Sequence, residues 1–188
     1  MIIAGIDYSL TSPSICVHDG NTWDVKNCKF YYLSPKPKWI VVSGQFFGTE
    51  YEKFDSDTHR YDNLSSWSSQ IISENKVTQC FIEGYAYGAV GRVFQIAENT
   101  GLLKYKLWKD GVPFGVFAPS EIKKHATGKG NSNKERLYEC FLDETHVDIR
   151  KTLDILNEKV WNPVSDIVDA YYIAKLGFNK MSTVEQNG

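Results

Sequence analysis

The feature that most constrains the fold is a segment near the C-terminal end that predicts a helix apolar on almost every side. The run NPVSDIVDAYYIAK, residues 162–175, has Pro163 at a position suited to the first helical residue and Asn162 in front of it as an N-cap candidate. Apolar residues then recur at helical spacing and leave little polar surface. We therefore expect other elements to pack against this helix on most sides.

The same helix carries two aspartates, Asp166 and Asp169, which lie one turn apart and therefore on one face. Two like charges at this spacing repel each other and lower the stability of the helix. Because both aspartates lie on a nearly buried helix, we expect a positive charge between them and the sheet.

The order of strand and helix patterns predicts the fold class. Three successive strand patterns predict an antiparallel meander, and helices and strands alternate after an irregular or short-strand stretch over residues 34–56. The expected strands are residues 1–10, 14–20, 22–33, 77–85 and 112–119, and the expected helices are residues 61–72, 92–111, 120–125, 132–142 and 162–175. Residues 143–161 hold at most one short helix. This order predicts a single α/β domain over residues 1–188, with a mixed five-stranded sheet flanked by helices.

Composition excludes several classes of protein. The chain of 188 residues is 42% hydrophobic, enough for one domain with a substantial core, and its net charge of -2 provides no global basic field for nucleic acid. The four cysteines are scattered without a CxxC pair, which indicates free thiols rather than a disulfide or zinc framework. The sequence has no signal segment and no apolar run of membrane-spanning length. We expect a cytoplasmic protein, located in the host cytoplasm if the chain is viral.

Four carboxylates are expected to meet at one edge of the sheet. Asp7 ends the first strand, Glu83 ends the fourth strand, which should lie beside it, and the closing helix can bring Asp166 and Asp169 to the same edge. Such a cluster without a positive charge is costly, because each carboxylate raises the pKa of the others. A pair of divalent cations removes the conflict, and hard oxygen ligands suit Mg²⁺ or Mn²⁺. The sequence therefore predicts a metal site.

Each of these signals also has an ordinary structural interpretation. An aspartate at a strand end is commonly a turn or cap residue, an Asp-x-x-Asp pair commonly lies on a solvated helix face, and Glu83 before Gly84 can be a plain strand terminus. The order of the four acids on this strand pattern is what favours the metal site.

Four motifs carry a resemblance to a known family. The segments AGIDYSLTSPSICV, CFIEGYAYG, VFAPSEIKKHATGKGNSNK and NPVSDIVDAYYIA occur in this order. They resemble the first strand, the glutamate-bearing strand, the basic segment and the closing Asp-x-x-Asp helix of the RuvC-like Holliday-junction resolvases, which belong to the RNase H-like superfamily. The resemblance covers most of the chain and departs from the family in residues 34–60 and 143–161. It implies that Asp7, Glu83, Asp166 and Asp169 take the catalytic positions.

The resemblance implies an endonuclease with two Mg²⁺ ions per active site, for which Mn²⁺ can substitute. Its substrate would be branched DNA, and it would resolve four-way junctions by paired symmetric nicks that leave 5′-phosphate and 3′-hydroxyl ends. A phage or viral member of the family fits this sequence. Two alternatives stay open: another RNase H-like nuclease, acting as a DNA nickase or on RNA–DNA hybrids, and a non-catalytic branched-DNA binding protein. A third alternative, an actin-type or sugar-kinase ATPase, needs two such domains and a longer chain, so the length argues against it.

Eight further residues are candidates for contact with DNA. They lie in a basic stretch around a glycine-bearing loop and in the loop after Glu83; they are Lys123, Lys124, Lys129, Lys134, Arg136, Tyr85, Tyr87 and Arg92. Small residues let a backbone approach phosphate closely, and tyrosines can stack on unpaired bases. The alternatives are a solvated charged surface for the basic residues and packing for the tyrosines.

A four-way junction has approximate two-fold symmetry, and one active site cuts one strand. We therefore expect a homodimer, the commonest symmetric assembly. Two helices have more aromatic surface than one sheet face needs, namely the helix around Trp67 and the helix that carries Phe94, Leu103, Tyr105 and Trp108. The alternative is that these side chains complete the core.

Overall fold

A computed structural model describes residues 1–85, 91, 93–155 and 159–187 of the chain. Over these residues the protein forms one mixed sheet with the strand order β4-β5-β3-β2-β1-β6-β7. The strands are β1 (Ile2–Asp7), β2 (Ser14–Asp19), β3 (Cys28–Ser34), β4 (Val42–Ser43), β5 (Phe46–Glu50), β6 (Gln79–Glu83) and β7 (Phe114–Phe117).

The strand pairing confirms the predicted α/β class and the meander. Strands β1, β2 and β3 pair antiparallel in succession, whereas β6 pairs parallel with β1, and β7 pairs parallel with β6. Because β1 and β6 are parallel neighbours, their carboxyl ends meet at one edge of the sheet, where Asp7 and Glu83 lie. This arrangement places two of the predicted site residues side by side.

The sheet has two more strands than the predicted five, and both come from the stretch expected to be irregular or to hold short strands. Strand β5 pairs parallel with β3, and the two-residue strand β4 folds back on β5. Gly44 makes the intervening turn with a φ of +56°, a conformation that glycine adopts without steric cost. The pattern over residues 34–56 was too short and too rich in proline and glycine to identify them.

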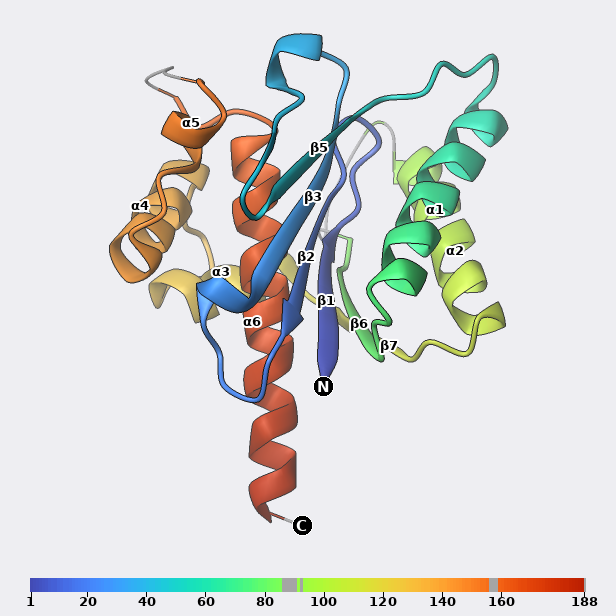
Figure 1. The fold of residues 1–188 in the computed structure, drawn as a ribbon. Coiled ribbons are helices and arrows are strands. Elements are labelled where there is room, and N and C mark those ends of the chain that lie inside the picture. The colour runs from blue at the N-terminus through green and yellow to red at the C-terminus, as the bar shows by residue number, and fades with distance from the viewer. Residues whose placement is uncertain (86–90, 92, 156–158, 188) are drawn as a thin grey trace.

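The helices cover both faces of the sheet. Figure 1 shows α1 and α2 on one face and α3, α4, α5 and α6 on the other, so the molecule has three layers. Each face has its own cluster of buried apolar side chains. The helices are α1 (Asp57–Glu74), α2 (Val93–Lys109), α3 (Pro119–Thr127), α4 (Lys134–Thr145), α5 (Ile149–Thr152) and α6 (Val164–Asn187), with short 3-10 helices η1 (Val25–Asn27) and η2 (Pro37–Trp39).

Helix α6 lies directly on the centre of the sheet. A Cβ atom built on Gly5 of β1 would lie 2.2 Å from the backbone nitrogen of Ala174 and 2.4 Å from the carbonyl oxygen of Ala170. A Cβ atom on Gly177 would likewise overlap the ring of Phe81 in β6. Glycine at these two positions allows the helix to lie this close to the sheet. Because the sheet then covers much of its surface, α6 is apolar on nearly every side. The same contact brings the first turns of α6 next to the end of β1.

The closing helix differs in its limits from the sequence prediction. It begins at Val164, one residue after Pro163, and runs to Asn187, twelve residues beyond the expected end at 175. In the described part of residues 143–161, α4 ends at Thr145 and the short helix α5 is the one further element. Among the described helices, none is both long enough and apolar enough to cross a membrane.

Candidate active site

Three of the four predicted carboxylates converge at the edge of the sheet where β1 ends and α6 begins. One carboxylate oxygen from each of Asp7, Asp166 and Asp169 lies within 4.8 Å of the others. Asp7 and Asp166 are buried, with 8% and 3% of their surface exposed, and Asp169 is half-buried. Glu83 ends β6 and lines the same cavity of about 310 Å³, together with these three residues. Sequence elements that are about 160 residues apart thus form one acidic site.

The electrostatics of the site are unfavourable without a cation. Burial raises the pKa of Asp7 well above its usual range, and the charges of Asp166, Asp169 and Glu83 raise it further. Burial, with the charge of Glu83 next in importance, raises the pKa of Asp169 to about 7. The pKa values of Glu83 and Asp166 are also raised, in both cases mainly by burial. The charge of Lys134 lowers all four pKa values without cancelling these effects, so full ionisation needs further positive charge.

The donor set fits a hard divalent cation. It consists of carboxylate oxygens, which Mg²⁺ and Mn²⁺ prefer, and they already lie close enough together to share one ion. The cost of holding ionised carboxylates in a buried position is then offset by the charge of the ion rather than by protonation.

A network of uncharged side chains orients Asp166. The hydroxyl of Ser12, in the β1–β2 connection, donates a hydrogen bond to Asp166 Oδ2 and accepts one from Asn162 Nδ2 at 2.6 Å. Ser165 Oγ lies 2.9 Å from Asn162 Oδ1 and 3.1 Å from Asp166 Oδ1, and its single proton can go to either. Ser12 therefore donates to one oxygen of Asp166, and the Ser165 hydroxyl lies within hydrogen-bond distance of the other, which orients the carboxylate.

Two of the predicted DNA-binding lysines lie at the carboxylate site itself. Lys134, the first residue of α4, donates to Ser165 Oγ at 3.0 Å, and its Nζ lies 3.7 Å from Asp166 Oδ1. The positive charges of Lys123 and Lys134 lower the pKa of Glu83 against the effect of burial. Both residues also line the carboxylate cavity. Lys123 and Lys134 are therefore part of the carboxylate site and do not form a separate basic loop.

The other predicted DNA-binding residues lie around the site. Lys124 and Lys129 are exposed on α3 and the loop after it, and exposed Arg136 pairs with Glu139 at 2.9 Å. Tyr85 is 43% exposed, and its hydroxyl donates to the carbonyl of Ala97 at 3.4 Å. Tyr87 and Arg92 lie outside the described residues.

Cavities extend from the carboxylates in two directions. On the side of α2, a cavity of about 490 Å³ shares Asp7, Ser9 and Glu83 with the carboxylate cavity. On the side of η2, a groove of about 970 Å³ shares Lys123, Lys134 and Asn162 with it. The acidic cluster thus lies between two further cavities and shares lining residues with both.

Solved structures with the same architecture are resolvases. Thermus thermophilus RuvC in complex with a Holliday junction matches with a TM-score of 0.62, 13% identity and coverage of 97% of each chain. The yeast mitochondrial Holliday junction resolvase Ydc2 matches with a TM-score of 0.60 and 13% identity, over 98% of this chain and 80% of that one. The chain has the RuvC-like resolvase fold.

A third RuvC-like structure, fowlpox virus resolvase in complex with Holliday junction DNA, matches with a TM-score of 0.53 and 15% identity, over 96% of this chain and 99% of that one. No family model matches the sequence, and no curated protein does. The similarity is therefore one of fold, and it confirms the RNase H-like architecture that the four sequence motifs predict.

The sequence analysis missed the residues that hold Asp166 in place. Ser12, Asn162 and Ser165 are common polar residues in a loop and a helix start, and nothing in their spacing distinguishes them. Asn162 was expected as an N-cap, but the structure shows its side-chain amide bridging Ser12 and Ser165 instead. One signal was available: Asn162 and Ser165 both lie within the closing motif.

Proposed function

We propose that this protein is a metal-dependent, structure-selective DNA endonuclease that resolves four-way junctions by paired symmetric nicks. The observation that carries the proposal is the group of three carboxylates within 4.8 Å of one another, placed on the RuvC-like fold with Glu83 in the same cavity. The solved RuvC and fowlpox virus resolvase structures are both complexes with Holliday junction DNA, which supports the choice of substrate.

Asp7, Glu83, Asp166 and Asp169 would hold two divalent cations, with Mg²⁺ as the expected ion and Mn²⁺ as its substitute. When bound, such ions lower the pKa of the attacking water and stabilise negative charge on the phosphate and on the leaving oxygen. Asp7 is the best candidate for the central metal ligand, because it is buried and the charges of Asp166, Asp169 and Glu83 all raise its pKa.

The neighbouring side chains have roles that follow from their contacts. Ser12 and Ser165 fix the orientation of Asp166, and Asn162 holds Ser12 in place. Lys134 supplies a flexible ammonium group beside Asp166, within reach of a phosphate bound at the carboxylates. These residues position the ligands and the phosphate and take no part in proton transfer.

A homodimer would supply the two active sites that a four-way junction needs. Support comes from α2, on which Phe94, Tyr105 and Trp108 are 79%, 54% and 72% exposed. The other residues that the sequence analysis assigned to this surface are internal: Leu103 is fully buried, and Trp67 packs against the core. The dimer surface is therefore proposed on the outer face of α2 alone.

One assay tests the proposed function against the two alternatives. The protein is incubated with an end-labelled four-way junction, a matched duplex and an RNA–DNA hybrid, each with Mg²⁺ or with a chelator. We expect Mg²⁺-dependent nicks at symmetric positions in two opposed strands of the junction, and products that a ligase can seal. Cutting of the duplex or the hybrid in preference to the junction would identify another RNase H-like nuclease. Junction binding without cutting would identify a binding protein.

A further inference from the structure

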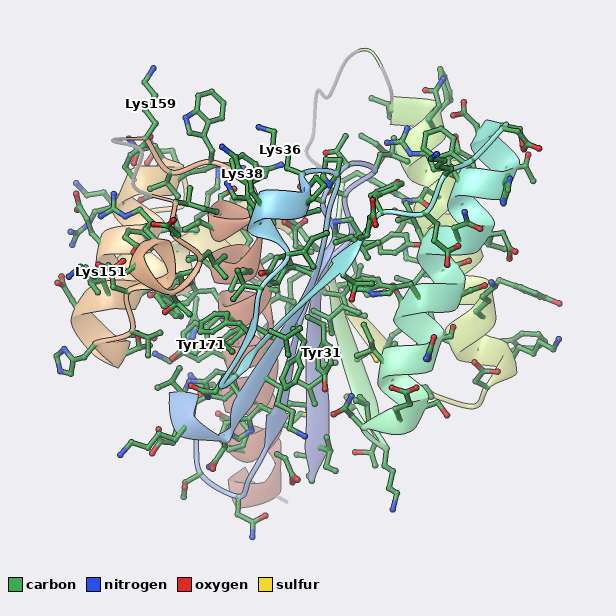
Figure 2. All side chains as sticks on the ribbon, turned by 45° about the horizontal axis from the view of Figure 1, so that its top comes forward. Tyr31, Lys36, Lys38, Lys151, Lys159 and Tyr171 are labelled. Carbon is green, nitrogen blue, oxygen red and sulfur yellow. The ribbon has the colours of Figure 1, made fainter. Side chains whose placement is uncertain are left out.

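A basic groove extends away from the carboxylates. Its volume is about 970 Å³, and its charged lining consists of five lysines and one glutamate. These are Lys36, Lys38, Lys123, Lys134, Lys159 and Glu135. Figure 2 shows Lys36, Lys38 and Lys159 at the same end of the molecule, whereas Lys151 lies lower on its side. A chain with a net charge of -2 thus concentrates positive charge next to its acidic site.

One wall of this groove is held firmly by the sheet. The segment around η2 passes over the buried Tyr32, whose hydroxyl donates to the carbonyl of Trp39 at 2.9 Å and accepts from the N–H of Val41 at 3.2 Å. Within the segment, the ammonium group of Lys36 lies 3.9 Å from the ring centre of Trp39, and that of Lys38 lies 5.4 Å from it. Cation–π contacts with the ring of Trp39 therefore hold the ammonium groups of both lysines at the groove.

The other wall is tied to the active site. Trp161 lines the groove and is 57% exposed, and the next residue, Asn162, donates to Ser12, the partner of Asp166. The carbonyl of Trp161 also accepts a hydrogen bond from Ser165 at 3.2 Å. The backbone of Trp161 is therefore held beside the carboxylate site, and its exposed indole lines the groove. Both walls come from segments for which the sequence predicted little regular structure.

We propose that this groove binds the backbone of one DNA strand next to the cleaved phosphate, and that Trp161 stacks on an unpaired base. The proposal rests on the proposed function, because it assigns the groove to the same substrate. Lysines spaced along a depression suit successive phosphates, and an indole face accepts any base. Unpaired bases occur where strands separate at a branch point, so the groove favours branched DNA over a fully paired duplex.

The first test removes charge while keeping the aliphatic stems. In the variant Lys36→Gln/Lys38→Gln/Lys159→Gln, binding to a fluorescent four-way junction is measured in chelator at several salt concentrations. Loss of about three single-strand phosphate contacts should make the slope of log affinity against log salt shallower by about 2. The matched control changes three exposed lysines at the opposite end of the sheet, Lys26, Lys29 and Lys76, to glutamine and should leave the slope unchanged.

The second test separates stacking from packing. Trp161→Ala should weaken junction binding by roughly ten-fold to a hundred-fold, with little effect on a matched duplex, and Trp161→Phe should recover part of the loss. Two results would overturn the proposal. The first is a salt slope in the groove variant equal to that of the wild type or of the control variant. The second is an equal loss of binding to junction and duplex for Trp161→Ala. Binding is measured without metal, so it does not depend on cleavage. If the wild-type protein failed to cut junctions, the proposed nuclease function would be refuted, but the binding measurements would still test the groove.

Discussion

Asp7 is the residue on which the proposed chemistry depends most. Its side chain is buried, and it is one of the three carboxylates that can share an ion. Asp7→Asn keeps the shape of the side chain and removes the charge that would hold metal. We expect junction cleavage to fall by at least about a thousand-fold, equivalent to about 4 kcal/mol of transition-state stabilisation. Junction binding in chelator should persist or tighten, because repulsion of the phosphates is reduced.

The exposed Asp110, in the turn after α2, provides a matched control, and Asp110→Asn should cut at the wild-type rate. Cleavage is measured in single-turnover reactions on a labelled junction, and binding by fluorescence anisotropy. Wild-type cleavage by Asp7→Asn would remove this residue from the mechanism.

Asp169 makes the stability of the metal-free protein depend on pH. Its pKa is about 7 in the folded protein against 3.8 for an ordinary aspartate, so between these values the folded state holds a proton that the unfolded chain releases. The contribution to stability is complete below about pH 4 and is lost as the pH rises through about 7. In chelator, the free energy of unfolding should therefore be higher at about pH 6 than at about pH 8.

Urea unfolding at a series of pH values checks this expectation. Asp169→Asn should flatten the pH dependence, and added Mg²⁺ should stabilise the wild type at about pH 8, because the ion binds the folded state. The expectation fails if the wild type shows no fall in stability over this interval, or if the variant falls equally.

The acidic residues of the site were predictable because each one lies at or near the end of a predicted strand or helix. Asp7 and Glu83 close strand patterns, and Asp166 and Asp169 share a helix face, so topology alone brings them together. Lys134 was expected to contact DNA from the basic stretch around the glycine-bearing loop. Its position over Asp166 depends on where α4 begins relative to α6, which is a tertiary relation that sequence spacing does not contain.

At the level of elements, the contact between α6 and β1 determines whether the site can form. Gly5→Ala would place a Cβ atom 2.2 Å from the backbone nitrogen of Ala174, and a backbone atom cannot rotate away. We expect a loss of about 1–3 kcal/mol in the free energy of unfolding, or more. Because α6 would move away from β1, Mg²⁺ should also stabilise the variant less than the wild type.

Gly101 is the matched control for this substitution. It lies within α2, is exposed, and has no atom within 4 Å of a built Cβ. Gly101→Ala should therefore stabilise the protein by about 0.5–1 kcal/mol, as expected for a helix interior. Both variants are measured by urea unfolding with and without Mg²⁺. If Gly5→Ala were as stable as the wild type, the close packing of α6 on β1 would be refuted.

The elements were predicted well where the hydrophobic pattern is long and poorly where it is short. The meander, the strand that ends at Glu83 and the helix that carries the aspartates all have runs long enough to show a period. Strands β4 and β5 have two and five residues, and α5 has four, so their patterns are too brief to distinguish from loops. The walls of the basic groove lie in such segments, which is why sequence analysis did not find it.

At the scale of the whole molecule, DNA and a second subunit would approach different surfaces. DNA would enter the three cavities, and the second subunit would contact the outer face of α2. The cavity on the η2 side and the cavity on the α2 side of the sheet each share lining residues with the carboxylate cavity. In Figure 1, α2 forms part of the outer layer on the face opposite α6. A subunit docked on the outer face of α2 would thus leave the basic groove open to DNA.

The last prediction concerns this second subunit. Helix α2 buries Leu103 and Leu107 completely, yet Phe94 and Trp108 on its outer side are 79% and 72% exposed. A helix that is apolar on two sides is expected to be covered on both, and a symmetric dimer covers the outer side with the same helix of a second copy. With two sites held together, the wild type should convert a supercoiled cruciform plasmid mainly to linear product.

Phe94→Glu/Trp108→Glu places charge in this contact and should give a monomer on the junction, seen as one protomer per junction in sedimentation. The monomer keeps its carboxylates, so it should still nick the cruciform, but nicked circles should replace linear product because the second cut requires a separate binding event. Val42→Glu is the matched control, since Val42 is 72% exposed on the edge strand β4 and lies away from α2. It should give linear product as the wild type does. Linear product from a protein that stays monomeric on the junction would show that the two cuts need no dimer.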